Sequence, residues 1–429
     1  SRQARWLPTW NVSGSWNAHE ENWWAPTFGK AWTYASLKAS YSLTADRGPA
    51  SNSLAVFQSF TPWRPSTSAN ESAIILAALE NSELTYEKKH ELNIGVALGF
   101  VDNRINVEFD WYRRNNFDLI GYTQTMGVGG VTTKLANDAT MESTGCEFTI
   151  STTNIKTKDF KWTTDWIFGW AENTITKLDS RSQVYSLVNG VGRTEGRPIG
   201  ALYSIPFAGL TEEGLPTFFI DAEHTQVVGP GNYAAIYFQE YENIDYLKYE
   251  GTIDPKITGS FGNTFSWKGL KLNVFFTYSF GNVLRLDNLC PVYSSDYSDL
   301  TASMKEMKNR WMVPGDENVT TIPSIPTVRQ MREIDALNNA YSAYNYSTER
   351  VAKGDFIRLK ELSLAYDLPK KYFEGQNAVS SFGVKLSATN LWLAYADKKL
   401  NGRDPEYYNT GGVSSPVPRQ FTLTVKLGF

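Results

Sequence analysis

One stretch, residues 84–114, constrains the fold of this chain more than any other. Apolar residues occupy every second position of 92–100, and small or polar residues fill the positions between them. Residues 101–104 have turn chemistry, and the alternation then restarts over 105–111. Because side chains of a β-strand point alternately to opposite faces, this pattern predicts a hairpin. Each strand is close to the ~9–11 residues that a tilted strand needs to cross a bilayer core, whereas strands of soluble proteins usually have ~5–6.

The composition suits a membrane barrel made of strands. The chain has 429 residues, of which 41% are hydrophobic and 14% aromatic, and it contains no apolar run long enough for a membrane-spanning helix. A barrel alternates lipid-facing and lumen-facing residues and concentrates aromatic residues at the two interfaces. A soluble β-rich protein would also fit this composition. The formal net charge of -4 without a basic run argues against nucleic acid as a partner.

The alternation recurs along the whole chain, so about eleven strands are expected. The further segments, taken by their apolar positions, are 10–16, 37–43, 146–150, 160–170, 257–265, 272–280, 357–368, 384–388 and 421–429. The parity of the apolar positions changes within 357–368, which predicts a β-bulge near Lys360 and Glu361. The fold class predicted is therefore all-β, a transmembrane antiparallel β-barrel.

Short and long connections alternate from the opening hairpin onward. The long ones are expected at about 46–84, 178–255 and 283–353. Since outer-membrane barrels have short periplasmic turns and long extracellular loops, the chain is expected to end on the periplasmic side and to begin at an extracellular loop. Bacterial single-chain barrels have an even number of strands, and an open edge in lipid leaves backbone groups unpaired. We therefore expect these strands to be part of a larger barrel.

Several short motifs occur along the chain in a specific order. They are Tyr86-Glu87 ahead of Asn93-Ile94-Gly95, Asp102-Asn103-Arg104, Asp110-Trp111-Tyr112, Gly196-Arg197-Pro198-Ile199-Gly200, Asp254-Pro255-Lys256, Phe356-Ile357-Arg358-Leu359-Lys360 and Pro416-Val417-Pro418-Arg419. Together they resemble the C-terminal half of SusC/RagA-type TonB-dependent outer-membrane transporters of Bacteroidetes. The resemblance covers nearly the whole chain.

This resemblance implies a barrel of about 22 strands filled by an N-terminal plug, of which residues 1–429 would form the C-terminal half. The plug, the Ton box and the N-terminal strands are absent from the sequence. Such transporters import large nutrients, either oligosaccharides or oligopeptides, across the bacterial outer membrane. The implied partners are the N-terminal half with its plug, a SusD-like surface lipoprotein, the TonB complex and outer-membrane lipid. The implied mechanism is binding and gated passage, so no enzyme activity is expected.

No catalytic residue, metal site or cofactor is predicted. His19, His90 and His224 are far apart, and none has a partner at metal-ligand spacing. The sequence has no Gly-x-Ser-x-Gly elbow, phosphate-binding glycine loop or Cys-x-x-Cys pair. Carboxylates on lumen-facing parity, such as Glu108 and Asp110, could form a glycosidase pair, but solvated lumen charge is the simpler interpretation.

Aromatic residues in the expected loops are candidates for substrate contact. They are Trp63, Tyr203, Tyr341, Tyr344 and Tyr346, which lie among Asn, Asp and Ser residues. Aromatic faces beside amides and carboxylates suit sugar stacking or peptide recognition, and they equally suit ordinary loop packing. Phe429, the last residue, resembles the aromatic barrel assembly signal recognised by the insertion machinery. A terminal lipid-facing aromatic residue explains it as well.

Two other functions are compatible with the sequence. The first is a passive porin-like or structural surface barrel, which differs from the importer in lacking a plug and Ton box. The second is a soluble β-rich glycan-binding module or hydrolase, which would be extracted without detergent. The number and length of strands with an apolar face argue against the soluble alternative. Whether the substrate is a glycan or a peptide is not encoded in any pattern of this sequence.

Overall fold

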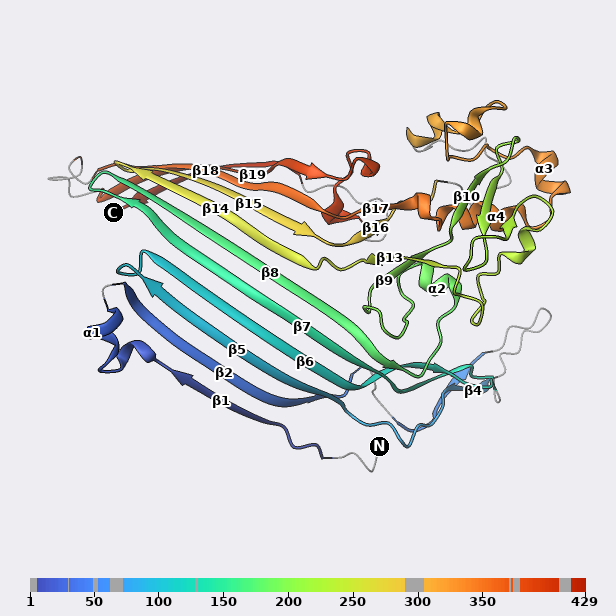
Figure 1. The fold of residues 1–429 in the computed structure, drawn as a ribbon, viewed down its shortest axis with the longest axis horizontal. Helices are drawn as coiled ribbons and strands as arrows, with labels where there is room; N and C mark the ends of the chain where they lie inside the picture. The colour runs from blue at the N-terminus through green and yellow to red at the C-terminus, as the bar shows by residue number, and fades with distance from the viewer. Residues whose placement is uncertain are drawn as a thin grey trace. The chain divides into compact units, whose positions relative to one another are not determined.

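A single large sheet dominates the computed structural model (Figure 1). The structure describes residues 6–29, 31–48, 53–61, 72–127, 130–289, 305–369, 372, 379–408 and 418–429. Eleven strands form the sheet in the order β1-β2-β5-β6-β7-β8-β14-β15-β18-β19-β20. Neighbours in this order are hydrogen-bonded, and every pair whose register is assigned is antiparallel. The predicted number of sheet strands is confirmed.

Most of the strands are longer than their apolar patterns, whereas β1, β18 and β20 have the predicted lengths. Their bounds are Trp10–Trp16 (β1), Trp32–Asp46 (β2), Glu87–Phe100 (β5), Ile105–Gln124 (β6), Thr133–Lys156 (β7), Phe160–Leu178 (β8), Ile257–Trp267 (β14), Leu270–Phe280 (β15), Phe356–Asp367 (β18), Ser381–Ala396 (β19) and Gln420–Gly428 (β20). The longest, β7, has 24 residues. Alternation identifies only the part of a strand that has one apolar face, so the polar extensions escaped prediction.

Tight turns with positive φ join β5 to β6 and β14 to β15. Val101, Asp102 and Asn103, between β5 and β6, have φ values of 52°, 53° and 58°. Between β14 and β15 the turn consists of Lys268 and Gly269, with φ values of 46° and 90°. Two consecutive positive φ angles are typical of the hairpin turns whose twist matches that of the strands.

The predicted bulge lies at Lys360. The register between β15 and β18 shifts where Phe275 pairs with Glu361 and Phe276 pairs with Leu359, which leaves Lys360 without a partner in that ladder. The ladder between β18 and β19 shifts at the same place. The extra residue explains why the apolar parity of this strand reverses along its length.

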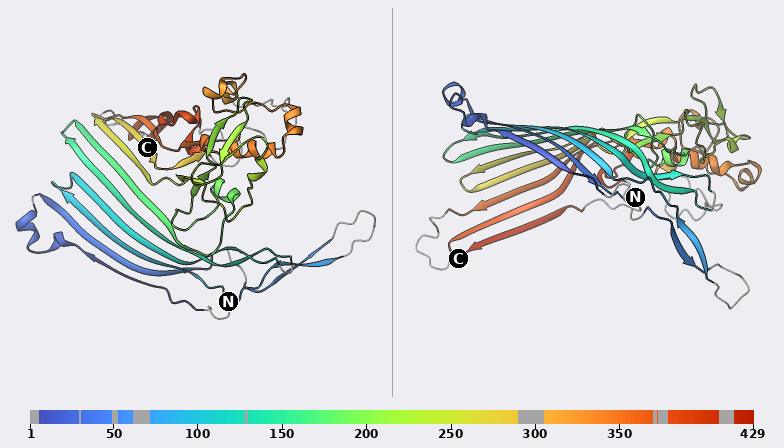
Figure 2. Two further views of the ribbon diagram at one scale, coloured as in Figure 1. Left: turned by 45° about the vertical axis from the view of Figure 1, so that its right-hand side comes forward. Right: turned by 90° about the horizontal axis from the view of Figure 1, so that it is seen from below.

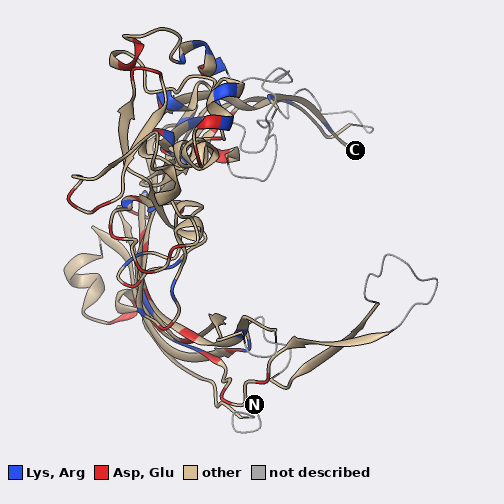
Figure 3. Cartoon of the chain, turned by 90° about the vertical axis from the view of Figure 1, so that its right-hand side faces the viewer, with Lys and Arg blue, Asp and Glu red and all other residues tan. Residues whose placement is uncertain are grey.

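One compact unit comprises Ser1–Thr149, Trp170–Arg181 and Thr194–Pro198. It contains β1, β2, β5, β6 and most of β7. The short helices η1 (Ala18–Glu20) and α1 (Trp24–Phe28) lie at one end of these strands, and the hairpin of β3 (Val56–Phe60) and β4 (Ala73–Ala78) extends from the other (Figure 2). This hairpin carries no charged residue within its strands and is drawn in tan in Figure 3.

The second compact unit comprises Ile150–Gly169, Ser182–Arg193 and Ile199–Phe429. Besides β14, β15, β18, β19 and β20 it contains small sheets and helices from the long connections. These are β9 (Ala201–Ser204) with β13 (Lys248–Thr252), β10 (Phe207–Leu210) with β11 (Pro216–Phe219) and β12 (Val227–Val228), β16 (Val283–Arg285) with β17 (Val351–Lys353), and the helices α2 (Val184–Val188), α3 (Val328–Glu333) and α4 (Leu337–Asn345).

The sheet strands of the second unit have one apolar and one polar face. Leu364 pairs with Leu386, and Leu386 pairs with Leu423, so the three leucines form a row across β18, β19 and β20. Their side chains are 45%, 52% and 67% exposed. On the other face Lys385 makes an ion pair with Glu361, with 3.2 Å between Nζ and Oε1. Exposed apolar rows opposite polar ones are what a strand between lipid and a polar lumen requires.

The long connections span 47–86, 179–256 and 281–355. These segments correspond to the loops expected as extracellular, and their location outside the cell remains a prediction. No helix in the described part of the chain has the length and apolar character needed to cross a membrane.

The β14–β15 turn gives a test of the fold. A Cβ at Gly269 would lie 2.5 Å from the backbone oxygen of Asp367, whereas one at Gly402, with a similar φ of +82°, meets nothing within 4 Å. We expect Gly269→Ala to lower the free energy of unfolding by ~1–3 kcal/mol more than Gly402→Ala, because the first adds overpacking to backbone strain. Thermal and urea unfolding of the two variants in detergent measure the difference. Equal losses would contradict the close approach of Gly269 to Asp367.

Candidate functional site

The two longest connections fold into a block with its own hydrophobic core. The core draws residues from 184–247 and 289–344, and its fully buried side chains include Leu187, Phe218 and Tyr233. Helix α4 contributes one face, because its buried residues Leu337, Ala340, Tyr341 and Tyr344 follow helical spacing. We name this part of the second unit the loop block. A core of this size fixes the loop surfaces instead of leaving them as open chain.

The structure separates the predicted tyrosines into two groups. Tyr341 and Tyr344 are buried in the loop block, with exposed fractions of 2% and 1%. The Tyr341 hydroxyl donates to the carbonyl of Ser324 at 2.7 Å, and the Tyr344 ring lies 5.7 Å from that of Phe207. These positions agree with loop packing, the alternative interpretation. Trp63 lies outside the described residues.

Tyr203 and Tyr346 are half-buried and share a neighbour, Arg285. The Arg285 guanidinium donates to the Tyr203 carbonyl and lies 6.0 Å from the centre of the Tyr346 ring. It also donates to the carbonyls of Ser347 and Val188. Burial lowers the pKa of Arg285 to about 10, and Glu250 opposes this shift. Arg285 therefore ties several backbone segments of the loop block together as a cation.

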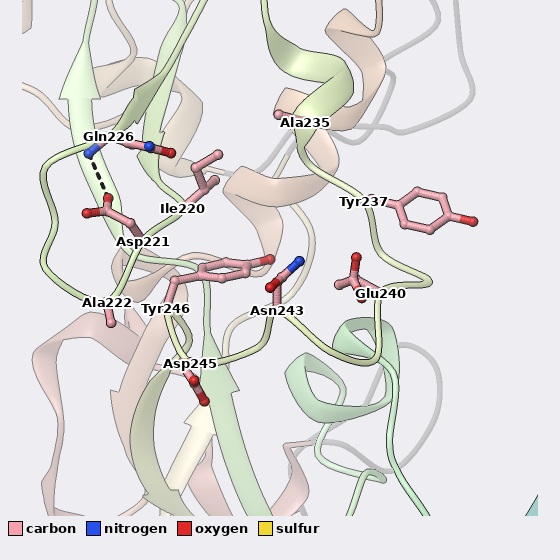
Figure 4. A pocket seen from close by; sticks show the side chains of 10 residues that line it. All are labelled: Ile220, Asp221, Ala222, Gln226, Ala235, Tyr237, Glu240, Asn243, Asp245 and Tyr246. Atoms are coloured by element: carbon pink, nitrogen blue, oxygen red, sulfur yellow. Dashed lines mark hydrogen bonds between the residues drawn. The ribbon is translucent and has the colours of Figure 1, made fainter.

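A hollow of about 470 Å³ opens on the loop block (Figure 4). Three carboxylates line it, those of Asp221, Glu240 and Asp245, together with the rings of Tyr237 and Tyr246. The side-chain amides of Gln226 and Asn243 add polar groups, and none of the described residues that line it is Lys, Arg or His. The hollow therefore combines negative charge, phenol rings and amides, the groups that bind hydroxyl-rich or amine-bearing ligands.

Local backbone donors hold two of these carboxylates. Asp221 accepts from the backbone N–H groups of Thr225 and Gln226 at 2.8 and 2.7 Å. Glu240 accepts from the N–H groups of Glu242 and Tyr241, both at 2.8 Å, and these bonds lower the pKa of Glu240. Bonds to the charged form favour ionisation, so the hollow stays negative at neutral pH.

Buried arginines fasten loop segments to the sheet and to one another. Arg358, at the start of β18, is 3% exposed; it pairs with Asp404 and places Nε 3.1 Å from Glu406. Arg350 pairs with Glu306 and donates to the Asp287 carbonyl at 2.7 Å. Removing one partner of such a pair leaves an uncompensated buried charge. No sequence pattern signals these pairings, because the partners lie more than forty positions apart.

The histidines occupy separate sites. His90 Nδ1 lies 3.0 Å from the Tyr41 hydroxyl, and His224 stacks on Phe219 with 5.0 Å between ring centres. Within the described ranges no group of three His, Cys, Asp or Glu side chains is arranged to hold a metal ion. Phe429 follows β20 and is 89% exposed, and its recognition as an assembly signal stays a prediction.

Two tyrosine variants test whether Tyr341 serves the core. We expect Tyr341→Phe to cost ~1 kcal/mol of unfolding free energy through its lost hydrogen bond, and Tyr341→Ala ~3–5 kcal/mol through the cavity. Calorimetry in detergent measures both losses. An unchanged stability of Tyr341→Ala would contradict a packing role and favour a role in substrate contact.

Alkaline titration tests the hollow. Burial and the nearby charge of Glu240 raise the pKa of Tyr246 to about 12 from 10.0. Because the folded-state pKa is raised, the stability from the neutral phenol is present below pH 10 and is lost as the pH rises towards 12. The tyrosinate absorbance of the wild type minus that of Tyr246→Phe should therefore rise with a midpoint about 12. A midpoint near 10 in the folded protein, as expected after denaturation, would refute the burial.

The chain is similar in sequence and in fold to known proteins. No family model matches it. It is 26% identical to TonB-dependent receptor P3 of Formosa agariphila over 97% of the chain and 43% of the receptor. Over 23% of the chain it is 34% identical to TonB-dependent receptor SusC of Bacteroides thetaiotaomicron, of which this covers 10%. The solved RagAB peptide transporter superposes on 100% of the chain with a TM-score of 0.76 at 22% identity, which covers 44% of the matched transporter chain and supports the fold.

The chain thus spans less than half the length of the curated receptors and of the solved transporter chain that it matches. The expected family, the all-β class and the eleven-stranded sheet agree with these likenesses. Along nearly its whole length, the chain is similar to part of the TonB-dependent receptors of the SusC/RagA type.

Proposed function

We propose that this chain forms the C-terminal half of an outer-membrane importer of large nutrients. The observation that carries the proposal is the similarity to TonB-dependent receptors along 97% of the chain. The two-faced sheet supports it, because strands with one apolar and one polar face suit a wall between lipid and a polar lumen. The remainder of the receptor would supply the plug, the contact with TonB and the strands that close the barrel at about 22 strands.

Substrate contact is assigned to the loop block. Its hollow offers phenol rings, amides and carboxylates, and the half-buried Tyr203 and Tyr346 lie in the same block. The substrate is an oligosaccharide or an oligopeptide, and the solved relative RagAB is described as a peptide transporter. A SusD-like lipoprotein would hold the substrate against the loops. Passage is gated by the plug and changes no covalent bond in the substrate.

The alternatives receive less support. A passive porin-like barrel would have no need of TonB, whereas the receptors that resemble this chain are TonB-dependent by name. A soluble glycan-binding module would leave rows of leucines, such as Leu364, Leu386 and Leu423, in water. Exposed apolar areas of that extent are rare on soluble monomers.

Purification of the protein from outer membranes in mild detergent tests the proposal. We expect mass spectrometry to find the N-terminal half of the receptor, a SusD-like lipoprotein and a trapped oligosaccharide or peptide. Recovery of this chain in the soluble fraction without detergent would overturn the barrel. Recovery in membranes with no plug-bearing polypeptide would favour the passive barrel.

Variants of the hollow test the assignment of the substrate site. We expect Tyr237→Ala combined with Asp245→Asn to weaken binding of the co-purified substrate about tenfold, equal to ~1.4 kcal/mol. Tyr237 is 55% exposed, and Tyr122→Ala, a 70% exposed tyrosine of β6, serves as the control. Calorimetric titration of the purified receptor measures the affinities. Equal affinities in all three proteins would exclude the hollow from the binding site.

A further inference from the structure

The hollow of the loop block lies between two walls that come from separate segments. One wall is the connection between β11 and β12, residues 220–226, and the other is the segment 235–246, which begins at the end of the short helix η2 (Tyr233–Ala235). Asp221 belongs to the first wall, whereas Glu240 and Asp245 belong to the second. Carboxylates therefore line the hollow on both sides (Figure 4).

Main-chain hydrogen bonds hold the second wall in place. The carbonyl of Glu240 accepts from the Val184 N–H at 3.0 Å, and the carbonyl of Phe238 accepts from the Tyr185 N–H at 2.8 Å. These bonds join the wall to helix α2, whose Val184 is fully buried in the core of the loop block. The hollow is thus formed before a ligand arrives, and a preformed site loses little conformational entropy on binding.

Tyr246 distinguishes the hollow from the core beneath it. It is 9% exposed, and its hydroxyl makes no hydrogen bond with any residue that the structure describes. The hydroxyl points into the hollow, towards the side on which Asn243 and Glu240 lie (Figure 4). The buried Tyr233 and Tyr341, by contrast, donate to carbonyl oxygens of the chain at 2.8 and 2.7 Å. Because a buried hydroxyl without a partner is destabilising, Tyr246 is a group that a ligand would satisfy.

The Asp245 carboxylate is a second group available to a ligand. It is exposed, and it forms neither a hydrogen bond nor an ion pair within the described part of the chain. The backbone bonds that Asp221 and Glu240 accept leave the charge of those carboxylates uncancelled. Burial and the charge of Glu240 together raise the pKa of the Tyr246 hydroxyl, so the negative field reaches the phenol. The described lining residues supply no cation against this field.

This charge selects among ligand classes. An acidic oligosaccharide or peptide would be repelled, because like charges interact more strongly in a partly desolvated site than in water. A neutral oligosaccharide gains nothing from the charge. A cation would pair with the carboxylates, and it would also be attracted to the face of the Tyr237 ring, which is 55% exposed. The volume of about 470 Å³ lies within the range of ligand pockets.

We propose that the hollow binds the basic side chains of an oligopeptide, so that the receptor prefers cationic oligopeptides to neutral and acidic ones. This inference rests on the proposed function, since it names the substrate class of the site assigned there. A ligand ammonium or guanidinium would donate to the Asp245 carboxylate and to the hydroxyl oxygen of Tyr246. Lys and Arg carry their charge at the end of a long stem, so they reach Tyr246 while the peptide backbone stays outside. An amino sugar carries its charge directly on a bulky ring.

Selection from a peptide pool tests the preference. The purified full receptor in detergent is incubated with synthetic octapeptides in which Ala alternates with Lys, Glu or Gln, and mass spectrometry identifies the retained peptides. We expect Lys to be enriched about threefold over Gln, the ratio expected of one partly screened ion pair, and Glu to be depleted. Lys at its frequency in the pool, or the retention of no peptide, would overturn the proposal.

Two charge-neutral variants assign the preference to the hollow. Asp245→Asn removes a charge of the hollow, whereas Glu212→Gln removes an exposed carboxylate of the loop block that does not line it. We expect Asp245→Asn to lose most of the enrichment of Lys over Gln and Glu212→Gln to keep it. Unchanged enrichment in Asp245→Asn would exclude the hollow as its source.

Tyr246→Phe tests the unpartnered hydroxyl. The variant keeps the ring and therefore the packing, but it removes the acceptor for the ligand N–H group. Calorimetric titration with a retained lysine peptide should give an affinity about threefold weaker than that of the wild type. An equal affinity would contradict a bond between the ligand and Tyr246.

The outcomes separate this inference from the proposed function. A receptor isolated from membranes with its plug that retains Lys and Gln peptides equally would refute the cationic preference and leave the importer intact. Stronger retention of a glucosamine oligomer, which is also a cation, would assign the hollow to amino sugars and overturn the peptide. Recovery of the chain without detergent would refute the importer and this inference with it.

Discussion

Backbone hydrogen bonding in an apolar surrounding governs this structure. A strand whose outer face meets hydrocarbon has no water to satisfy its N–H and C=O groups, so each must be paired by a neighbouring strand. The eleven strands follow one another across the sheet in chain order, so each strand pairs with the sheet strands before and after it in the sequence. The long connections add small strands and helices beyond the ends of the sheet strands and leave that order unchanged. Because lipid covers the apolar rows, no protein layer is needed against them.

The same requirement explains which parts of the fold were predictable. Alternation is a local signal, so β5, β6 and the change of parity at Lys360 could be identified from a few consecutive residues. The turn at Asp102 and Asn103 could also be predicted, because Asp and Asn tolerate the positive φ angles that such a turn requires.

The loop block could not be predicted in the same way. Its core joins segments that are far apart, such as Phe207 and Tyr344, and its residues show no period that spans the contacts. The candidate aromatic residues have similar neighbours in the sequence but different environments in the structure. Tyr341 is in the core, whereas Tyr203 is partly accessible. The hollow with Asp221 and Glu240 was missed because its carboxylates come from separate turns, each ordinary by itself.

Arg285 shows how such a block tolerates change. Its guanidinium binds carbonyl oxygens of residues 188, 203 and 347, and a carbonyl is present whatever side chain the residue carries. These three bonds therefore involve no side-chain acceptor. Surface side chains of the loops can therefore diversify over generations while the framework beneath them keeps its geometry. A receptor built this way can acquire new cargo preferences without redesigning its scaffold.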